Sequence, residues 1–541
     1  MLFRIKQQTG DSLTYALSIA TGERLFHPHH LLYNGLVRSF YLIINFLFPA
    51  TDAVLAAQLF NIFWAIVSVI SIYMIVKMIS HSEILGILAA CLLLVSFGFW
   101  MYTSQVEVYI PATGCLACLT AIIVSRKQQI QNRKKLIWFS ILFGMAILFH
   151  QTNVLFCIPL VYLFVAFQGR QGFATSIQVV AGTGLSVLFI YIIVFIFSAG
   201  RWDLHWFIRF CKSYTYYANP DWGNVAHFSF TGMRKLVSSQ MSNILYFHAN
   251  SGFNIKLFFI LPLGGAVVVN SICKIKNRSI DSPFRLFLLL WMLTYYLFFL
   301  WWLPGDREFF IVTLVPIIIL IFMSSHDLLS LVATHKWIQK GIYIVFAGLI
   351  ASVFVVNFKR VLPMHQSFGA SYKEAKQLAN HSSKEGVILA PYELHSHLKY
   401  YFPEKNALIL PHHIFYNHKK MPYKYQKIAE KCRIVPLRYV QPENTIFQKN
   451  RTRIASEWCD WIAWLFNFQY NSSRRLIAYH QFHVVQNMKD QILIVEPVVQ
   501  RIDGIQDFLQ ISQKILNVDP NLFTSVFNDW SVNLEKSDKN E

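Results

Sequence analysis

The sequence lacks both the charge density of a soluble domain and the short motifs of common nucleotide and ester enzymes. Only 14% of its 541 residues are charged, whereas soluble domains carry roughly 25%. It contains no Walker loop, no Gly-x-Gly-x-x-Gly and no Gly-x-Ser-x-Gly, so neither nucleotide hydrolysis nor α/β-hydrolase chemistry is indicated. Residues Met1 to Gln8 contain no apolar run, so we expect no signal peptide.

Cysteine is also sparse, with eight residues in the chain. Cys115 and Cys118 have a metal-like spacing, but they lie in an apolar run and no second pair follows. We therefore interpret them as small buried apolar side chains. Cys432 and Cys459 share the C-terminal region and would pair only in an oxidising compartment, so the sequence leaves that disulfide open.

Apolar side chains dominate what is present. Hydrophobic residues make up 55% of the chain and aromatic residues 16%, which indicates a polytopic membrane protein. Lys and Arg exceed Asp and Glu by 48 to 28, mostly in loops and in the C-terminal third. We attribute this positive charge to loops that set the topology and to attraction for head groups or phosphate, rather than to nucleic acid.

The apolar runs predict about ten membrane spans, preceded by an amphipathic run from Leu36 to Phe48 that favours the membrane interface. The spans are expected near residues 54–76, 84–100, 108–125, 136–150, 152–167, 174–198, 255–273, 284–303, 308–324 and 341–357. The boundary at 150–152 is weak, because the two short segments beside it could form one broken helix.

The basic loops predict the orientation of these spans. Residues 126–135, 274–278 and 335–340 are rich in Lys, Arg and His and should face the cytoplasm. Residues 11–50 then lie on the opposite face, together with the loops 100–107, 199–254 and 304–308 and the C-terminal region. An outward N-terminal loop with no span before it means either that its short tail is translocated or that a first helix is missing from this sequence. We favour the second explanation.

From about Val361 the pattern changes to short β-like runs separated by helical ones. The runs at 386–391, 407–411 and 491–496 are bounded by turn residues, which is typical of strands. We predict an outward loop with an interfacial helix over 1–53, a helical membrane domain over 54–357 and a soluble α/β domain over 358–541. The sequence does not indicate the role of the soluble domain.

Four loops on the predicted outward face carry ionisable or polar side chains. They contain Asp11 with Glu23, Arg24 and His27–His30; Gln105–Tyr109; His150–Asn153; and Gly305–Glu308. Each has an ordinary explanation: Glu107 as an interfacial acid, His150 as a helix-end histidine and Arg307 as a snorkelling anchor. Their convergence on one face favours a site, because polar groups at membrane depth usually face a cavity.

The three histidines His27, His29 and His30 suggest zinc. Pro28 interrupts any helical spacing between them, however, which argues against a preformed metal site. The sequence indicates no cofactor with certainty and leaves a divalent metal open.

In order along the chain, these elements resemble a known enzyme family. They are Asp11, a glycine, His27-Pro28-x-x-x-Leu32-Tyr33, Phe99-Trp100 with Glu107-Val108-Tyr109, His150-Gln151-Thr152, and Trp301 to Phe309. The set is similar to the polyprenyl-phosphate-sugar-dependent glycosyltransferases of the GT-C fold, and most of all to the bacterial protein O-mannosyltransferase-like branch. The resemblance covers roughly residues 10–325, and an outward soluble C-terminal domain is common in that fold.

The resemblance implies an integral-membrane glycosyltransferase, in a bacterial inner or plasma membrane, that moves a sugar from a polyprenyl phosphate to a protein, glycan or lipid acceptor on the non-cytoplasmic face. Asp11 would be the catalytic base, and Glu107 the second acid, which orients the acceptor or helps to hold a metal. Substrate-binding residues would be Arg24, His27, His30, Tyr33, His150, Arg307 and Glu308. Ser12 stands where a second acid would favour metal binding. The alternative is a lipid-linked saccharide transporter, which would carry charges along the middle of several spans.

Overall fold

The computed structural model describes two compact units. Its described residues are 5–125, 133–199, 202–211, 223–246, 267–276, 281–381, 387–390, 392–409, 468–470, 476–488 and 492–503. The first unit comprises Met1–Gln8, Tyr15–Cys211 and Asp221–Ser367, and the second comprises Thr9–Thr14, Lys212–Pro220 and Phe368–Glu541. The first unit contains most of the helices, and the second contains the strands.

The described part of the first unit is built from helices. They are α1 (Gly10–Thr21, divided between the units), α2 (Tyr33–Leu47), α3 (Ala53–Ser80), α4 (Glu83–Val95), α5 (Phe97–Thr103), α6 (Tyr109–Ser125), α7 (Arg133–Phe149), α8 (Cys157–Gln168), α9 (Arg170–Ala199), α10 (Leu204–Cys211), α11 (Phe230–Ile244), α13 (Ser282–Trp302), α14 (Ile311–Leu331) and α15 (Lys336–Gln366). Short 3-10 helices lie at η1 (Pro28–His30), η3 (Gln151–Phe156), η5 (Val225–His227) and η6 (Glu308–Phe310).

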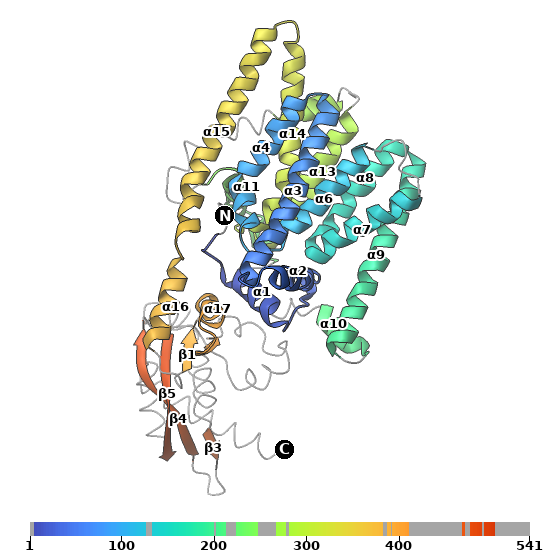
Figure 1. Ribbon diagram of the computed structural model, residues 1–541. Coiled ribbons are helices and arrows are strands. Elements are labelled where there is room, and N and C mark those ends of the chain that lie inside the picture. The colour runs from blue at the N-terminus through green and yellow to red at the C-terminus, as the bar shows by residue number, and fades with distance from the viewer. Residues whose placement is uncertain are drawn as a thin grey trace. The chain divides into compact units, whose positions relative to one another are not determined.

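The helices α2, α4, α6 and α14 pack against α3 (Figure 1). The Asp52 side chain caps α3 by accepting a hydrogen bond of 2.7 Å from the Leu55 amide, which satisfies a free donor of the first turn. α3 packs against α4 and α6, and α14 contacts all three. A Cβ atom at Gly114 would lie 2.9 Å from the Trp64 carbonyl oxygen, so glycine lets the backbones of α6 and α3 approach closely.

Among the described residues, six helical segments are long and apolar enough to cross a bilayer: α3, η3 with α8, α9, α13, η6 with α14, and the helix that begins at Lys336. α4 and α5 together form a bent pair, with an angle of 63° at Ser96. The structure has helix at every predicted span position except 255–273, which lies partly outside the described residues. The chain is therefore a multi-pass membrane protein, while the count of ten spans stays a prediction.

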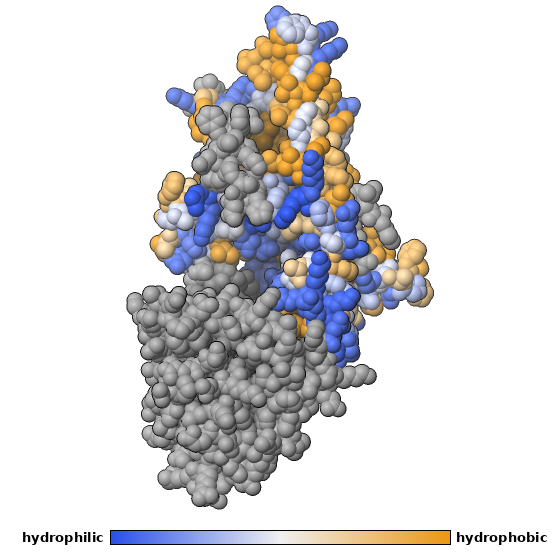
Figure 2. Space-filling model, turned by 90° about the vertical axis from the view of Figure 1, so that its left-hand side faces the viewer, coloured by the Kyte–Doolittle hydropathy of each residue, from blue (hydrophilic) through white to orange (hydrophobic). Residues whose placement is uncertain are grey.

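Apolar side chains cover the outer surface of the helices. Figure 2 shows them gathered on one face of the first unit, α15 among the helices that carry them. The predicted amphipathic run forms α2, whose Ile43 and Phe46 are 61% and 85% exposed. Its other face is buried at Tyr33 and Val37. One exposed apolar face and one packed face are what a helix lying in a membrane interface requires.

A buried amide on α15 fastens the ends of two other helices. Asn357 is fully buried. Its Nδ2 donates to the carbonyl oxygens of Val95, 2.8 Å away, and Ile244, 2.9 Å away. Its Oδ1 accepts from the amide of Tyr246 at 3.0 Å. Asn357 thus supplies partners to the C-terminal ends of α4 and α11, which would otherwise have free carbonyls.

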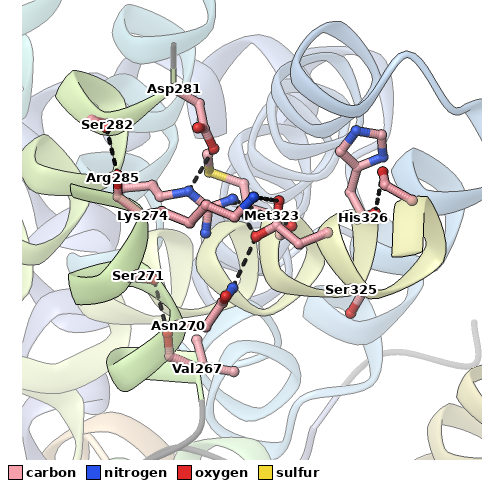
Figure 3. A network of polar contacts seen from close by, with 12 residues as sticks. Val267, Asn270, Ser271, Lys274, Asp281, Ser282, Arg285, Met323, Ser325 and His326 are labelled. Atoms are coloured by element: carbon pink, nitrogen blue, oxygen red, sulfur yellow. Dashed lines mark hydrogen bonds and ion pairs between the residues drawn. The ribbon is translucent and has the colours of Figure 1, made fainter. Parts of the chain in front are cut away.

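A charged network joins α13 to α14 at the helix ends farthest from the 304–308 loop (Figure 3). Arg285 is 1% exposed and pairs with Asp281 one turn earlier and with Asp327 on α14, 2.8 Å away. Asn270 and Lys274, from the helical segment 267–276, also contact Asp327. Because these charges neutralise one another, the buried guanidinium of Arg285 is not left as an unpaired charge.

The second unit combines two helices with a five-stranded sheet. The helices are α16 (Ala370–His381) and α17 (Tyr392–Tyr401), and the strands are β1 (Val387–Ala390), β2 (Asn406–Ile409), β3 (Phe468–Tyr470), β4 (Leu476–Met488) and β5 (Ile492–Asp503). The order is β2-β1-β5-β4-β3, with β1 and β2 parallel and the other neighbours antiparallel. Strands lie where three β-like runs were predicted. The α/β domain as a whole stays a prediction, because most residues after Ile409 lie outside the described ranges.

Candidate active site

Glu107 lies in a short connection between α5 and α6 that two polar side chains of α3 hold in place. Its side chain is 2% exposed. The Nδ2 of Asn61 donates to the carbonyl oxygens of Gln105 and Glu107, both at 2.9 Å. Gln58, one turn earlier on α3, donates to the Ser104 carbonyl at 2.6 Å. The position of the Glu107 backbone is therefore set by side chains from a neighbouring span.

Tyr33 connects this loop to α2. Its hydroxyl donates to Asn61 Oδ1 at 3.3 Å, so one amide contacts both the Glu107 loop and Tyr33. Burial raises the pKa of Tyr33 well above its usual value, and the nearby Glu107 carboxylate raises it further. Tyr33 therefore stays a neutral hydroxyl that can donate a hydrogen bond.

Tyr109, two residues after Glu107, connects two of the predicted loops, Gln105–Tyr109 and Gly305–Glu308. Its hydroxyl donates to Glu308 Oε1 at 2.8 Å, although the two residues are 199 positions apart in the chain. The centre of its ring lies 4.8 Å from that of His150. His150 Nδ1 is 2.6 Å from Thr152 Oγ1, so its ring orientation is fixed by a neighbour in the third loop.

The histidine cluster lies beside His150. η1 begins at Pro28, and the rings of His27, His29 and His30 have centroid separations of 4.2 to 4.9 Å. The rings of His29 and His150 are 6.3 Å apart. Burial lowers the pKa of His27 to about 4, and it lowers the pKa of His30 well below the usual value. These imidazoles are therefore neutral at physiological pH.

Arg307 occupies the fourth loop beside an aromatic ring. Asn243 of α11 donates to the Arg307 carbonyl at 2.8 Å. The Arg307 guanidinium carbon lies 5.9 Å from the centre of the Tyr246 ring, and that of Arg360 lies 4.4 Å from the same centre. Two guanidinium groups on one tyrosine make a positive cluster, which suits an anion. The sequence reasoning missed Arg360, because it lies near the end of a long apolar helix.

Two further predicted site residues lie on α1 and in the turn after it. Arg24 is exposed at a left-handed turn with φ of 51°, and among the described residues it makes no hydrogen bond, ion pair or ring contact with the other predicted ones. Asp11 lies in the second unit, in the first turn of α1. Within that unit the Gly10 amide donates to Glu393 Oε2 at 2.6 Å, so a carboxylate of α17 caps the start of α1.

Gly98 permits the contact that positions Arg307. A Cβ atom at Gly98 would lie 2.1 Å from Asn243 Oδ1 and 2.7 Å from its Cγ. The variant Gly98→Ala should therefore displace Asn243 and lower the free energy of unfolding by about 1–3 kcal/mol. Thermal unfolding of the purified protein in detergent measures this change.

The matched control for this variant is Gly184→Ala in α9, where nothing lies within 4 Å of the added methyl group. We expect its midpoint of thermal unfolding to equal that of the wild type or to rise slightly, since alanine favours helix. Equal stability of Gly98→Ala and Gly184→Ala would show that Asn243 does not need the space at Gly98.

Comparisons with known proteins show what this chain is similar to. A family model described as dolichyl-phosphate-mannose-protein mannosyltransferase matches residues 39–197, which include Glu107, Tyr109 and His150. No curated protein matches the chain. ArnT from Cupriavidus metallidurans, crystallised with undecaprenyl phosphate, is similar in structure with a TM-score of 0.52 and 10% identity, covering 91% of this chain and 95% of ArnT. An oligosaccharyltransferase from Archaeoglobus fulgidus, crystallised with Zn and sulfate, is similar with a TM-score of 0.50 and 11% identity. The match covers 87% of this chain and 69% of the oligosaccharyltransferase.

These likenesses establish the fold. The predicted GT-C fold of the polyprenyl-phosphate-sugar glycosyltransferases is confirmed, because the similarity extends over nearly the whole of ArnT and most of this chain. The identities are low, so the roles of individual residues rest on the geometry of this chain.

Proposed function

We propose that this protein is an integral-membrane glycosyltransferase, which moves a sugar from a polyprenyl-phosphate donor to an acceptor on the non-cytoplasmic face. One observation carries the proposal: loops that are far apart in the sequence meet in a single cluster of the first unit. Tyr33 and Asn61 hold the Glu107 loop, Tyr109 contacts Glu308, and its ring packs on His150. A structural role for each loop alone would not require this convergence.

The reaction needs a base at the acceptor and positive charge at the leaving group. The acceptor oxygen attacks the anomeric carbon and its proton passes to the Asp11 carboxylate, while the bond from that carbon to the phosphate oxygen breaks. Glu107 orients the acceptor. The departing polyprenyl phosphate keeps the electron pair of the broken bond, and Arg307 neutralises it, assisted by Arg360, which contacts the same Tyr246 ring.

The neighbours in the fold support a lipid-linked donor. ArnT was crystallised with undecaprenyl phosphate. The description of the matching family model names dolichyl-phosphate-mannose. A donor anchored in the bilayer suits a site built on loops at the ends of spans, because its phosphate lies at the membrane surface. The same geometry disfavours the transporter alternative, since the charge of the buried Arg285 is paired with Asp327 at helix ends.

The neighbouring oligosaccharyltransferase was crystallised with Zn, which raises the question of a metal in this chain. Among the described residues, one group of three or more His, Cys, Asp or Glu side chains could hold an ion. It consists of His27, His29 and His30. Glu107 belongs to no such group in the described part of the chain. The donor atoms that fit a metal are therefore imidazole nitrogens, and the chain's own carboxylates and guanidinium groups carry the sugar-transfer step.

The test supplies purified protein with radiolabelled polyprenyl-phosphate sugar and a cell-envelope fraction as the acceptor. We expect label to move into the acceptor from the lipid donor and not from a nucleotide sugar. In a parallel experiment the protein is reconstituted in vesicles that hold the labelled lipid. Movement of intact labelled lipid across the bilayer without chemical transfer would overturn the proposal in favour of transport.

A further inference from the structure

We propose that His27, His29 and His30 form a binding site for one divalent transition metal of the zinc class. This inference concerns binding alone and does not depend on the proposed sugar transfer. Each histidine offers one ring nitrogen, and these three atoms lie within 4.8 Å of one another. Tetrahedral zinc with nitrogen ligands at about 2.0–2.1 Å needs nitrogens about 3.4 Å apart, so small rotations of the imidazole rings complete the site.

The 3-10 turn explains how adjacent histidines converge. Pro28 starts η1, and the His30 amide donates to the His27 carbonyl oxygen at 3.0 Å. This turn replaces the helical spacing whose absence had argued against a metal site. Two anchors hold it in place: the Leu32 amide donates to the Leu148 carbonyl at 3.0 Å, and the Tyr191 hydroxyl donates to the Pro28 carbonyl. The ligand loop is therefore fixed to α7 and α9 before any ion binds.

Ring nitrogens of His27 and His30 are buried and have no hydrogen-bond partner among the described residues. His30 is 0% exposed, and neither of its ring nitrogens has a hydrogen-bond partner among the residues that the structure describes. The Nδ1 atom of His27 is likewise buried and has no partner within the described ranges. Buried polar atoms of this kind are rare, because leaving water without a new partner costs free energy. A metal ion would supply the missing interaction.

The ligand set also selects the metal. Imidazole nitrogens favour Zn²⁺, Co²⁺, Ni²⁺ or Cu²⁺, whereas Mg²⁺, Ca²⁺ and Mn²⁺ favour carboxylate and carbonyl oxygens. The cluster contains no carboxylate, so we expect zinc to bind far more tightly than magnesium. Three protein ligands leave a fourth position open. The ring of His150 lies next to the cluster, 6.3 Å from that of His29, and its Nδ1 atom is occupied by Thr152.

The experiment uses the full chain, purified in detergent without a histidine tag and stripped of metal with a chelator. Cobalt is titrated in, and visible ligand-field absorption reports tetrahedral binding; zinc content is measured by elemental analysis after dialysis. The variants are His27→Ala and His30→Ala. The matched control is His205→Ala, an exposed histidine on α10, and monodisperse elution with an unchanged thermal midpoint reports folding.

We expect about one zinc per chain in the wild type and in His205→Ala, and at least a tenfold weaker affinity in His27→Ala and His30→Ala. Magnesium in large excess should not displace cobalt. Absence of ligand-field absorption in the wild type would overturn the proposal without reference to any variant. So would equal zinc content in His30→Ala and His205→Ala. A chain that binds zinc but transfers no sugar would contradict the proposed function and leave the metal site standing.

Discussion

The variant Asp11→Asn is expected to lower sugar transfer by about 10²- to 10⁴-fold, the range that general bases contribute. Asparagine keeps the size of the side chain and removes the oxygen that accepts the acceptor's proton. Donor binding should change little, since the phosphate contacts are assigned to guanidinium groups. The measurement is single-turnover transfer of label from the polyprenyl-phosphate sugar, with the donor KM determined in parallel.

The control for this experiment is Asp52→Asn. Asp52 caps α3 through its side-chain oxygen, and asparagine caps helices about as well as aspartate, so this variant changes the same functional group and should keep full activity. Equal transfer by wild type and Asp11→Asn would remove Asp11 from the reaction. A large loss in Asp52→Asn would instead point to a general sensitivity of the fold.

The variant Asn61→Leu should damage both stability and transfer. It removes three buried hydrogen bonds, to the carbonyls of Gln105 and Glu107 and from the Tyr33 hydroxyl. At about 1 kcal/mol each, the free energy of unfolding should fall by about 3 kcal/mol. Misplacement of Glu107 by about 1 Å would lower the rate by about 10²-fold. Thermal unfolding and the transfer assay at a temperature well below the midpoint separate these two effects.

Ser71→Ala provides the comparison on the same helix. Ser71 is buried, and its hydroxyl donates a hydrogen bond to the Val67 carbonyl within α3. Because this bond does not reach the Glu107 loop, removal of the hydroxyl should leave the transfer rate unchanged. If Asn61→Leu were as active as Ser71→Ala in folded samples, Asn61 would be a packing residue and would not position Glu107. A lowered rate with an unchanged donor KM would support the positioning role.

The positions of the helices along the chain were largely predictable, and the reason is physical. A span needs about twenty apolar residues, and this requirement appears directly in runs such as 54–76. The amphipathic run that forms α2 could be recognised in the same way, as could the loops that carry Glu107, His150 and Arg307. Hydrophobicity acts along the chain, so its pattern can be recognised locally.

Contacts between distant residues could not be predicted in this way. Asn61 looks like a minor interruption of an apolar run, yet it fixes a loop 46 residues later. The pair Gln58 and Asn61, three residues apart on one helix face, was a usable signal, because polar groups inside a span need partners. Glu393 caps Gly10 across 383 residues, and no local pattern marks that pairing. The convergence of the three histidines depended on a turn that helical spacing does not describe.

Asn357 also constrains the order in which the membrane domain is completed during synthesis. Its amide is the partner of backbone groups 262 and 113 residues earlier in the chain. The ends of α4 and α11 therefore gain these hydrogen bonds only after the ribosome has made α15. In a lipid environment, backbone groups without partners cost several kcal/mol, so the early helices stay incompletely fastened until this late insertion. A chain released before residue 357 would carry its first spans in a form that quality-control proteases can recognise.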